Sequence, residues 1–156
     1  MYFWNINELK RKLISGEISE DGAFIYFFAV LVLDTLWIAT WGLFPTEYEP
    51  NVWDYAEMVG YVLIVIGGTF ILYRRNGGSK GEKFFLRYFT LLWVLGIRFF
   101  VYCIPLVIFW AALIWQNENY PEPKLWYETM ALLFTFVLYY WRLAVHIGEV
   151  VRASRI

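Results

Sequence analysis

Four long apolar runs dominate the sequence, and they limit what the chain can fold into. They cover residues 23–44, 55–73, 88–115 and 126–147. A helix of about 20 mainly apolar residues spans the ~30 Å hydrocarbon layer of a bilayer. Backbone polar groups in lipid must be hydrogen-bonded internally, and these runs are continuous instead of alternating, so helices are expected in place of barrel strands. The sequence therefore predicts an all-α fold, an integral membrane four-helix bundle forming one domain over residues 1–156.

The composition agrees with a lipid environment. Of the 156 residues, 60% are hydrophobic, and the net charge is only −1. The four runs leave too little polar sequence to cover a water-soluble core of this size. The charge balance shows no excess basicity, so direct binding of nucleic acid is not expected. Cys103 is the only cysteine, which excludes an intramolecular disulfide and a cysteine-based metal site.

The distribution of basic residues predicts the topology. Ten Lys or Arg residues lie in the first 22 residues, between residues 74 and 87 and in the tail, whereas the connections after the first and third runs hold only Lys124. Connections rich in Lys and Arg stay in the cytoplasm under the positive-inside rule. We therefore expect a multi-pass protein with both termini in the cytoplasm.

The first 20 residues differ from the apolar runs. Ile6, Leu9 and Leu13 recur at helical spacing, and Gly16 is suited to end a helix. Ser19 then provides an N-cap for the first span. The pattern predicts an amphipathic interfacial helix lying on the inner leaflet. Its role as a simple anchor, a partner-docking element or a membrane sensor is left open.

One stretch of this segment resembles a known group of proteins. The stretch is Phe3-Trp4-Asn5-Ile6-Asn7-Glu8-Leu9-Lys10, followed by Leu13-Ile14-Ser15-Gly16 and Ser19-Glu20. It is similar to the start of small bacterial integral membrane proteins with four spans. The resemblance implies a bacterial source, and it brings no activity, cofactor or site residue with it.

Two opposite charges fall in the middle of predicted spans. Asp34 lies eleven residues after Ala23, and Arg98 lies ten residues after Tyr88, in helices that run in the same direction. Their depths therefore match, and a charge at the bilayer centre costs from ~3 to ~10 kcal/mol unless it is compensated. The sequence predicts an ion pair between Asp34 and Arg98, with the first and third spans in contact. The pair is open to two interpretations, a lock for helix packing or part of a polar path.

The last predicted span carries a polar stripe near the inner surface. Arg142, His146 and Glu149 follow the spacing i, i+4, i+7 and share one helix face. A single histidine without further ligands does not make a zinc or iron site, so no metal is expected. The stripe is interpreted as a packing or snorkelling feature, with pH sensing as the alternative.

Basic residues at the inner side form a candidate docking surface for anionic lipid or an acidic partner. Each is worth about 1 kcal/mol near a negatively charged leaflet, although the positive-inside requirement alone also accounts for them. The set is Lys10, Arg11, Lys12, Arg74, Arg75, Lys80 and Lys83.

No constellation of nucleophile, base and orienting group is visible, so no catalytic residue and no cofactor are expected. The sequence favours a non-enzymatic, homo-oligomeric inner-membrane subunit that acts as a sensor, anchor or pore-forming effector of a multi-protein bacterial system, such as a defence or stress-response module. A cytoplasmic protein partner fits this interpretation. The alternative is an ion channel or small transporter that uses Asp34.

Overall fold

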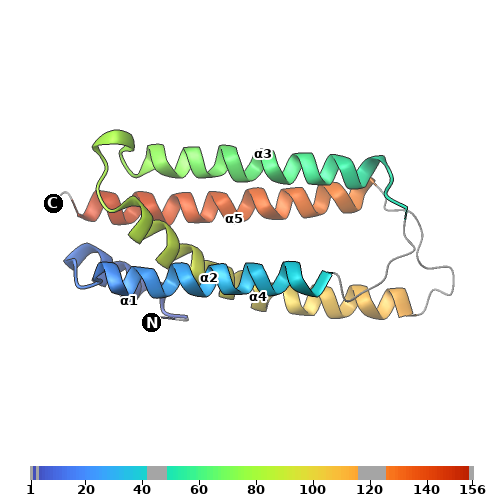
Figure 1. Cartoon of the computed structure of the whole chain (residues 1–156), viewed down its shortest axis with the longest axis horizontal. Coiled ribbons are helices and arrows are strands. Elements are labelled where there is room, and N and C mark those ends of the chain that lie inside the picture. Colours follow the sequence, from blue (N-terminus) through green and yellow to red (C-terminus); the bar gives the residue numbers. More distant parts are fainter. Residues whose placement is uncertain (1, 3, 42–48, 116–125, 155–156) are drawn as a thin grey trace.

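The computed structural model describes residue 2 and residues 4–41, 49–115 and 126–154. Over these ranges every regular element is helical, so the predicted all-α class is confirmed. Helices α2, α3 and α5 run along the long axis, and α4 crosses obliquely between them (Figure 1). The elements are α1 (Ile6–Ser15), α2 (Glu20–Trp41), α3 (Val52–Arg75), the 3₁₀ turn η1 (Gly78–Lys80), α4 (Phe84–Trp115) and α5 (Trp126–Ala153).

Three helices in the described ranges are long and apolar enough to cross a membrane. They are α3 over Val52–Arg75, α4 over Phe84–Pro105 and α5 over Trp126–Ala153. They correspond to the second, third and fourth predicted spans. The first predicted span, 23–44, corresponds to α2, and its residues 42–44 lie outside the described residues, as does Lys124. The chain thus has the helices of a multi-pass membrane protein.

The long helices pack as two pairs. Helix α3 packs on α5, helix α2 packs on α4, and contacts between α4 and α5 join the pairs. The predicted contact between the first and third spans is therefore present. Gly60 and Gly68 permit the close approach of α3 to α5, because a Cβ at Gly60 would lie 2.7 Å from Cδ1 of Leu133 and one at Gly68 would overlap the Tyr140 ring.

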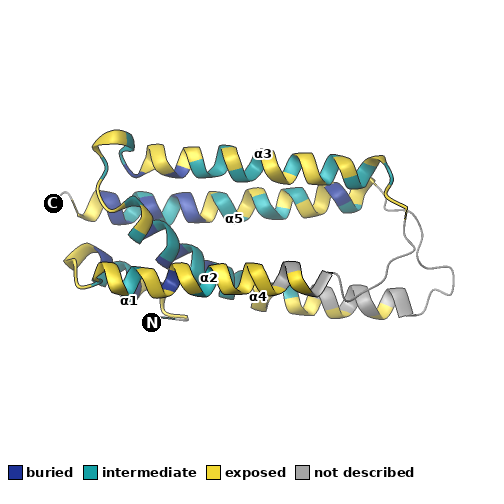
Figure 2. Ribbon diagram, viewed as in Figure 1, coloured by how far each residue is buried: buried dark blue, intermediate teal, exposed yellow. Residues whose placement is uncertain are grey.

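The buried core is concentrated at one end of the bundle. We call this end, which contains α1, the connection 76–83 and the last turns of α5, the basic end; the opposite end is the far end. Figure 2 shows buried residues gathered toward the basic end, with exposed residues along much of α2 and exposed and intermediate residues along α3. Both termini also lie toward the basic end (Figure 1). The core cluster comprises Ile6, Leu9, Leu13, Leu72, Leu91, Val94, Leu95, Leu143, Ala144, Ile147, Val150 and Val151.

Helix α1 has the predicted limits. The Asn5 side chain accepts a hydrogen bond from the Glu8 backbone N–H at 3.1 Å, and Gly16 ends the helix in the left-handed conformation, with φ of 73°. The predicted Ser19 cap is also present, since its hydroxyl accepts from Gly22 N–H at 3.2 Å.

The position of α1 corrects the expectation of an interfacial helix. It packs on α4 and α5, and the side chains of Ile6, Leu9 and Leu13 are 0–4% exposed within the core cluster. A leaflet surface would leave part of this face among polar headgroups, whereas the Leu and Val side chains of α4 and α5 bury it completely. The amphipathic helix is therefore part of the bundle.

Candidate functional site

An ion pair between distant segments joins α1 to α5. Lys10 Nζ donates to Glu149 Oε2 at 2.9 Å, although the two residues are 139 positions apart. His146, one turn earlier on α5, places Nδ1 3.0 Å from the same carboxylate oxygen. Glu149 therefore bridges α1 to His146, and we call this group of Lys10, His146 and Glu149 the α1–α5 junction.

The junction brings together residues from two sets that were predicted separately, the docking surface and the polar stripe. Lys10 belongs to the predicted docking surface, and His146 and Glu149 belong to the predicted polar stripe. Arg142, the third stripe residue, lies one turn from His146 on the exposed surface and makes no hydrogen bond or ion pair with any described residue. The stripe is thus divided between a closed contact near the basic end and an exposed guanidinium deeper along α5.

A groove of about 390 Å³ lies beside the junction. One wall is α1 and the other is the last two turns of α5. Lys10, Arg11 and Glu149 bring both signs of charge into it, beside the exposed side chain of Ile14. The lining residues are Asn7, Lys10, Arg11, Ile14, Glu149, Val150 and Ala153.

Arg98 has a different partner from the predicted one. Its Nε donates to the Trp4 carbonyl oxygen at 2.9 Å, its Nη2 donates to the same oxygen, and its guanidinium carbon lies 5.4 Å from the Trp4 ring centroid. Trp4 in turn contacts Tyr102, with ring centroids 6.3 Å apart. Because α1 packs alongside α4, it brings residue 4 to Arg98, and the predicted Asp34–Arg98 pair is replaced by this clamp on the amino-terminal segment.

Asp34 lies on the exposed face of α2. It makes no hydrogen bond or ion pair with any residue in the described ranges. A charge in this position needs a compensating group or water if α2 crosses a bilayer.

Arg87 organises the basic end, and sequence reasoning missed this role. The residue is 7% exposed; its Nη1 donates to Asn76 Oδ1 at 3.0 Å and its Nη2 donates to Ser154 Oγ at 3.1 Å. Asn76 also donates to the Glu82 carbonyl at 3.1 Å, and only a glycine fits at position 81 against its backbone. In the sequence, Arg87 directly precedes the apolar run 88–115. The positive-inside rule alone already accounts for an arginine there, so the sequence does not indicate its buried role.

The remaining basic residues fall into two groups. Some contact the protein itself: Lys12 pairs with Glu17 at 3.3 Å, and Arg75 donates to the Ala144 carbonyl at 3.4 Å. Lys83 lies beside Gly16 at the end of α1. Others are exposed at the basic end, namely Arg11, Arg74 and Lys80. The predicted docking surface is therefore only partly free to bind a ligand.

Lys12 and Glu17, near the start of the chain, have shifted pKa values. Hydrogen bonding to the Ser15 hydroxyl, and then to Lys12, lowers the pKa of Glu17 below its usual 4.5. The Tyr2 hydroxyl, and then the Glu17 carboxylate, raise the pKa of Lys12 above 10.5. Glu17 is exposed and Lys12 is partly exposed, so these shifts report a local surface cluster and not a buried site.

No group of three or more His, Cys, Asp or Glu side chains that could hold a metal ion is found among the residues that the structure describes. Comparison with models of protein families, with curated proteins and with solved structures gives no match to this chain. The predicted resemblance to small four-span bacterial proteins therefore stays a prediction.

Proposed function

We propose that this protein is a non-enzymatic, homo-oligomeric subunit of the bacterial inner membrane with both termini in the cytoplasm. In this proposal its membrane helices assemble with copies of themselves, and its basic end contacts a cytoplasmic partner. It acts as the sensor, anchor or pore-forming effector of a multi-protein system, and a defence or stress-response module is the class that fits.

The observation that carries the proposal is a pair of opposite charges on exposed helix faces. Asp34 on α2 and Arg142 on α5 are both exposed, and neither forms an ion pair within the described part of one copy. An unpaired charge facing lipid costs at least ~3 kcal/mol on insertion scales. A second copy supplies the missing partner for each, since it presents both signs.

The depths of the two charges support such a contact. Asp34 lies fourteen residues after Glu20, roughly 21 Å along α2 at 1.5 Å per residue. Arg142 lies eleven residues before Ala153, roughly 16 Å along α5 from the same end. The length of an arginine side chain covers the difference. Helices α2 and α5 are not a packed pair within one copy, so their exposed faces remain for neighbours.

The partner-facing part of the proposal uses the basic end. The groove beside the α1–α5 junction is held in shape by the Lys10–Glu149 contact and presents Asn7, Arg11 and Ile14 at its edge. Because the Lys10–Glu149 contact ties α1 to α5, a displacement of α1 also moves α5, which carries Arg142. A partner that binds this groove can thereby act on the membrane helices.

The test is the mass of the purified protein in mild detergent, measured by native mass spectrometry. Wild type should be an oligomer. Asp34→Arg and Arg142→Asp should each dissociate it, and the charge-swapped double variant should restore it, because each interface regains opposite charges. Arg152→Asp, at the exposed end of α5, is the control that should leave the mass unchanged. A monomeric wild type, or a double variant no better than the single ones, would refute the assembly.

A channel or small transporter is the second candidate, because an exposed mid-helix carboxylate also suits a water-filled path. Protein reconstituted in liposomes would then conduct cations, and Asp34→Asn would change the flux. A silent wild type together with a partner that binds the α1–α5 groove favours the subunit.

A further inference from the structure

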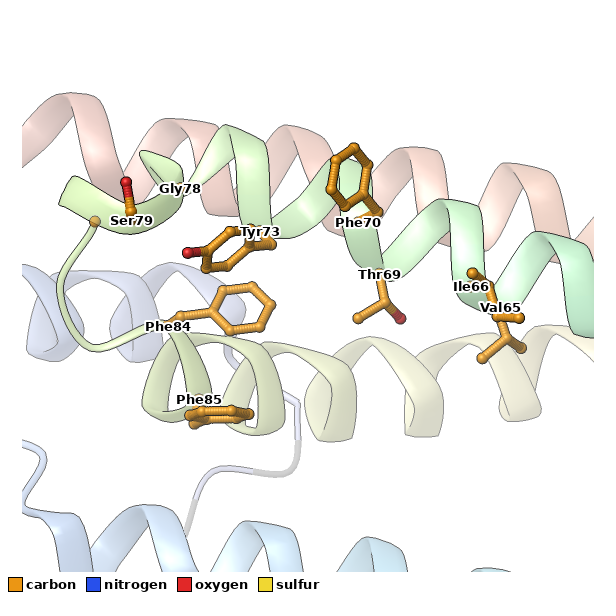
Figure 3. Close-up of a pocket in the computed structure, with 10 residues that line it drawn as sticks. Val65, Ile66, Thr69, Phe70, Tyr73, Gly78, Ser79, Phe84 and Phe85 are labelled. Carbon is orange, nitrogen blue, oxygen red and sulfur yellow. The ribbon is translucent and has the colours of Figure 1, made fainter.

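Helices α3 and α4 leave an open groove between them at the basic end. It has a volume of about 800 Å³ and extends from the connection 76–83 along residues 65–73 of α3, with the first two residues of α4 on its other side. Figure 3 shows Thr69 and Tyr73 on α3 pointing toward α4, with the Phe84 ring opposite Tyr73. Ile66 and Phe70 on α3 and Phe85 on α4 also line the groove. Ser79 and Gly81 close its end. The groove is therefore bounded by two helices and by the connection between them.

The sides of the groove are apolar and exposed. Ile66 is 63% exposed, Phe70 57% and Phe85 72%. Both bounding helices are long and apolar enough to cross a membrane. Its lining is mainly apolar, with hydroxyl groups only on Thr69, Tyr73 and Ser79, and such a surface suits an acyl chain better than water.

The mouth of the groove is basic. The guanidinium carbon of Arg74 lies 5.3 Å from the ring centroid of Phe70, so this charge sits at the groove edge. Lys80 is exposed between Ser79 and Gly81, which line the groove. Glu82 is the only acid among residues 74–83 against four basic residues, which gives a local charge of 4 − 1 = +3.

These two cations differ from the other basic residues of this end. Lys10, Lys12, Arg75 and Arg87 are already bound to protein oxygens. Arg74 and Lys80 form no ion pair with any described carboxylate. They are therefore available for an anion at the level where the apolar groove meets the membrane surface.

We propose that this groove binds one anionic phospholipid of the inner leaflet. An acyl chain lies along Ile66, Phe70 and Phe85, and the phosphate lies between Arg74 and Lys80. The arrangement of an apolar slot below two free cations selects a lipid by charge, since a zwitterionic headgroup gains less from the cations. The site requires that α3 and α4 cross the membrane with the basic end on the cytoplasmic side, and in this it rests on the topology of the proposed function; it does not depend on the oligomeric assembly proposed above.

The test is native mass spectrometry of the detergent-purified protein titrated with phosphatidylglycerol and with phosphatidylcholine. Wild type should bind one phosphatidylglycerol in preference to phosphatidylcholine. Arg74→Gln with Lys80→Gln should weaken phosphatidylglycerol about 30-fold, roughly fivefold for each cation, and bring it close to phosphatidylcholine. Lys12→Gln with Arg152→Gln removes the same charge at cations that already contact Glu17 and the Gly148 carbonyl, and should retain the preference.

A second variant addresses the apolar part. Ile66→Trp, at an exposed position, should weaken both lipids by filling the slot while leaving the helix content by circular dichroism unchanged. Equal weakening by the two double variants would reduce the site to net charge and overturn the proposal. Binding of inorganic phosphate as tight as that of the lipid, or equal affinity for the two lipids, would overturn it as well.

Discussion

The two ends of this molecule use the same kind of helix in different ways. At the basic end, α1, α3, α4 and α5 bury a continuous cluster of mainly leucine, isoleucine and valine side chains, with Leu9, Leu72, Leu91, Leu143 and Ile147 at zero exposure. Toward the far end, large side chains such as Leu63 and Phe134 remain more than 60% exposed. A membrane can solvate the far end, whereas the basic end is packed like the interior of a protein.

The two regions differ in how far contacts within one chain determine their structure. The basic end carries the ion pairs and the buried arginine, and its geometry follows from contacts within one chain. The middle of the long helices carries two exposed charges, Asp34 and Arg142, which one chain leaves without ion pairs in its described part. We infer that contacts within one chain determine the structure of the basic end, and that the charges on the long helices are compensated by neighbouring molecules.

The largest expected contrast between the two regions comes from leucine truncation. Leu9→Ala removes a fully buried side chain, which should reduce the free energy of unfolding by about 3 kcal/mol, within the usual 2–5. Leu63→Ala removes a side chain that is 64% exposed and should cost less than about 0.5 kcal/mol. Unfolding in mixed dodecyl sulfate micelles, followed by circular dichroism, measures both. Equal losses in the free energy of unfolding for the two variants would contradict the difference between the two ends.

Arg87→Met should have the next largest effect, about 2 kcal/mol, because charge-assisted hydrogen bonds to Asn76 and Ser154 are lost and Asn76 Oδ1 loses this donor. Cleavage of the connection 76–83 by a protease in detergent should become faster. The matched control is Arg152→Met, whose hydrogen bond to the Gly148 carbonyl is exposed. Unchanged protease resistance in Arg87→Met would show that the clamp is dispensable.

Lys10→Gln tests the junction and should cost about 0.5 kcal/mol, since the Glu149 side chain is 40% exposed and its ion pair is partly screened. Amide hydrogen exchange in α1 should accelerate more than exchange in α3. Arg11→Gln, on the exposed face of α1, is the control. If the double variant Lys10→Gln with Glu149→Gln shows purely additive costs, the two side chains do not interact.

The smallest effect concerns pH and the surface cluster at Glu17. Its pKa is lowered from 4.5, so the stabilisation it gives is present above pH 4.5 and is lost as the pH falls through the lower folded-state pKa. Carbon-13 NMR of labelled glutamate should find this pKa below 4.5, and Ser15→Ala should raise it. A pKa at or above 4.5 in the wild type would contradict the hydrogen bond to Ser15.

Much of the fold could be predicted from local sequence. The apolar runs, the helical spacing of Ile6, Leu9 and Leu13, and the helix end at Gly16 are properties of a few neighbouring residues, and each has its counterpart in the structure. The limits of the helices differ from those predicted by only a few residues.

The partners of the polar groups could not be predicted in the same way. Equal depth made Asp34 and Arg98 appear to be partners, but depth does not specify which faces meet. Arg98 instead binds Trp4, 94 residues away, because α1 docks along α4. The Lys10–Glu149 contact spans 139 residues and depends on the same docking. A hydrophobic pattern predicts that α1 has an apolar face, and it does not tell whether lipid or protein covers that face.

The docking of α1 into the bundle is the central claim, and zero-length crosslinking tests it most directly. A carbodiimide joins an amine to a carboxylate only when they touch, as Lys10 Nζ and Glu149 Oε2 do at 2.9 Å. Peptide mass spectrometry of the treated protein in membranes should find an amide bond between Lys10 and Glu149, and it should disappear in Glu149→Gln. Crosslinks from Lys10 only to neighbouring acids within residues 1–21 would contradict the docked position and return α1 to the membrane surface.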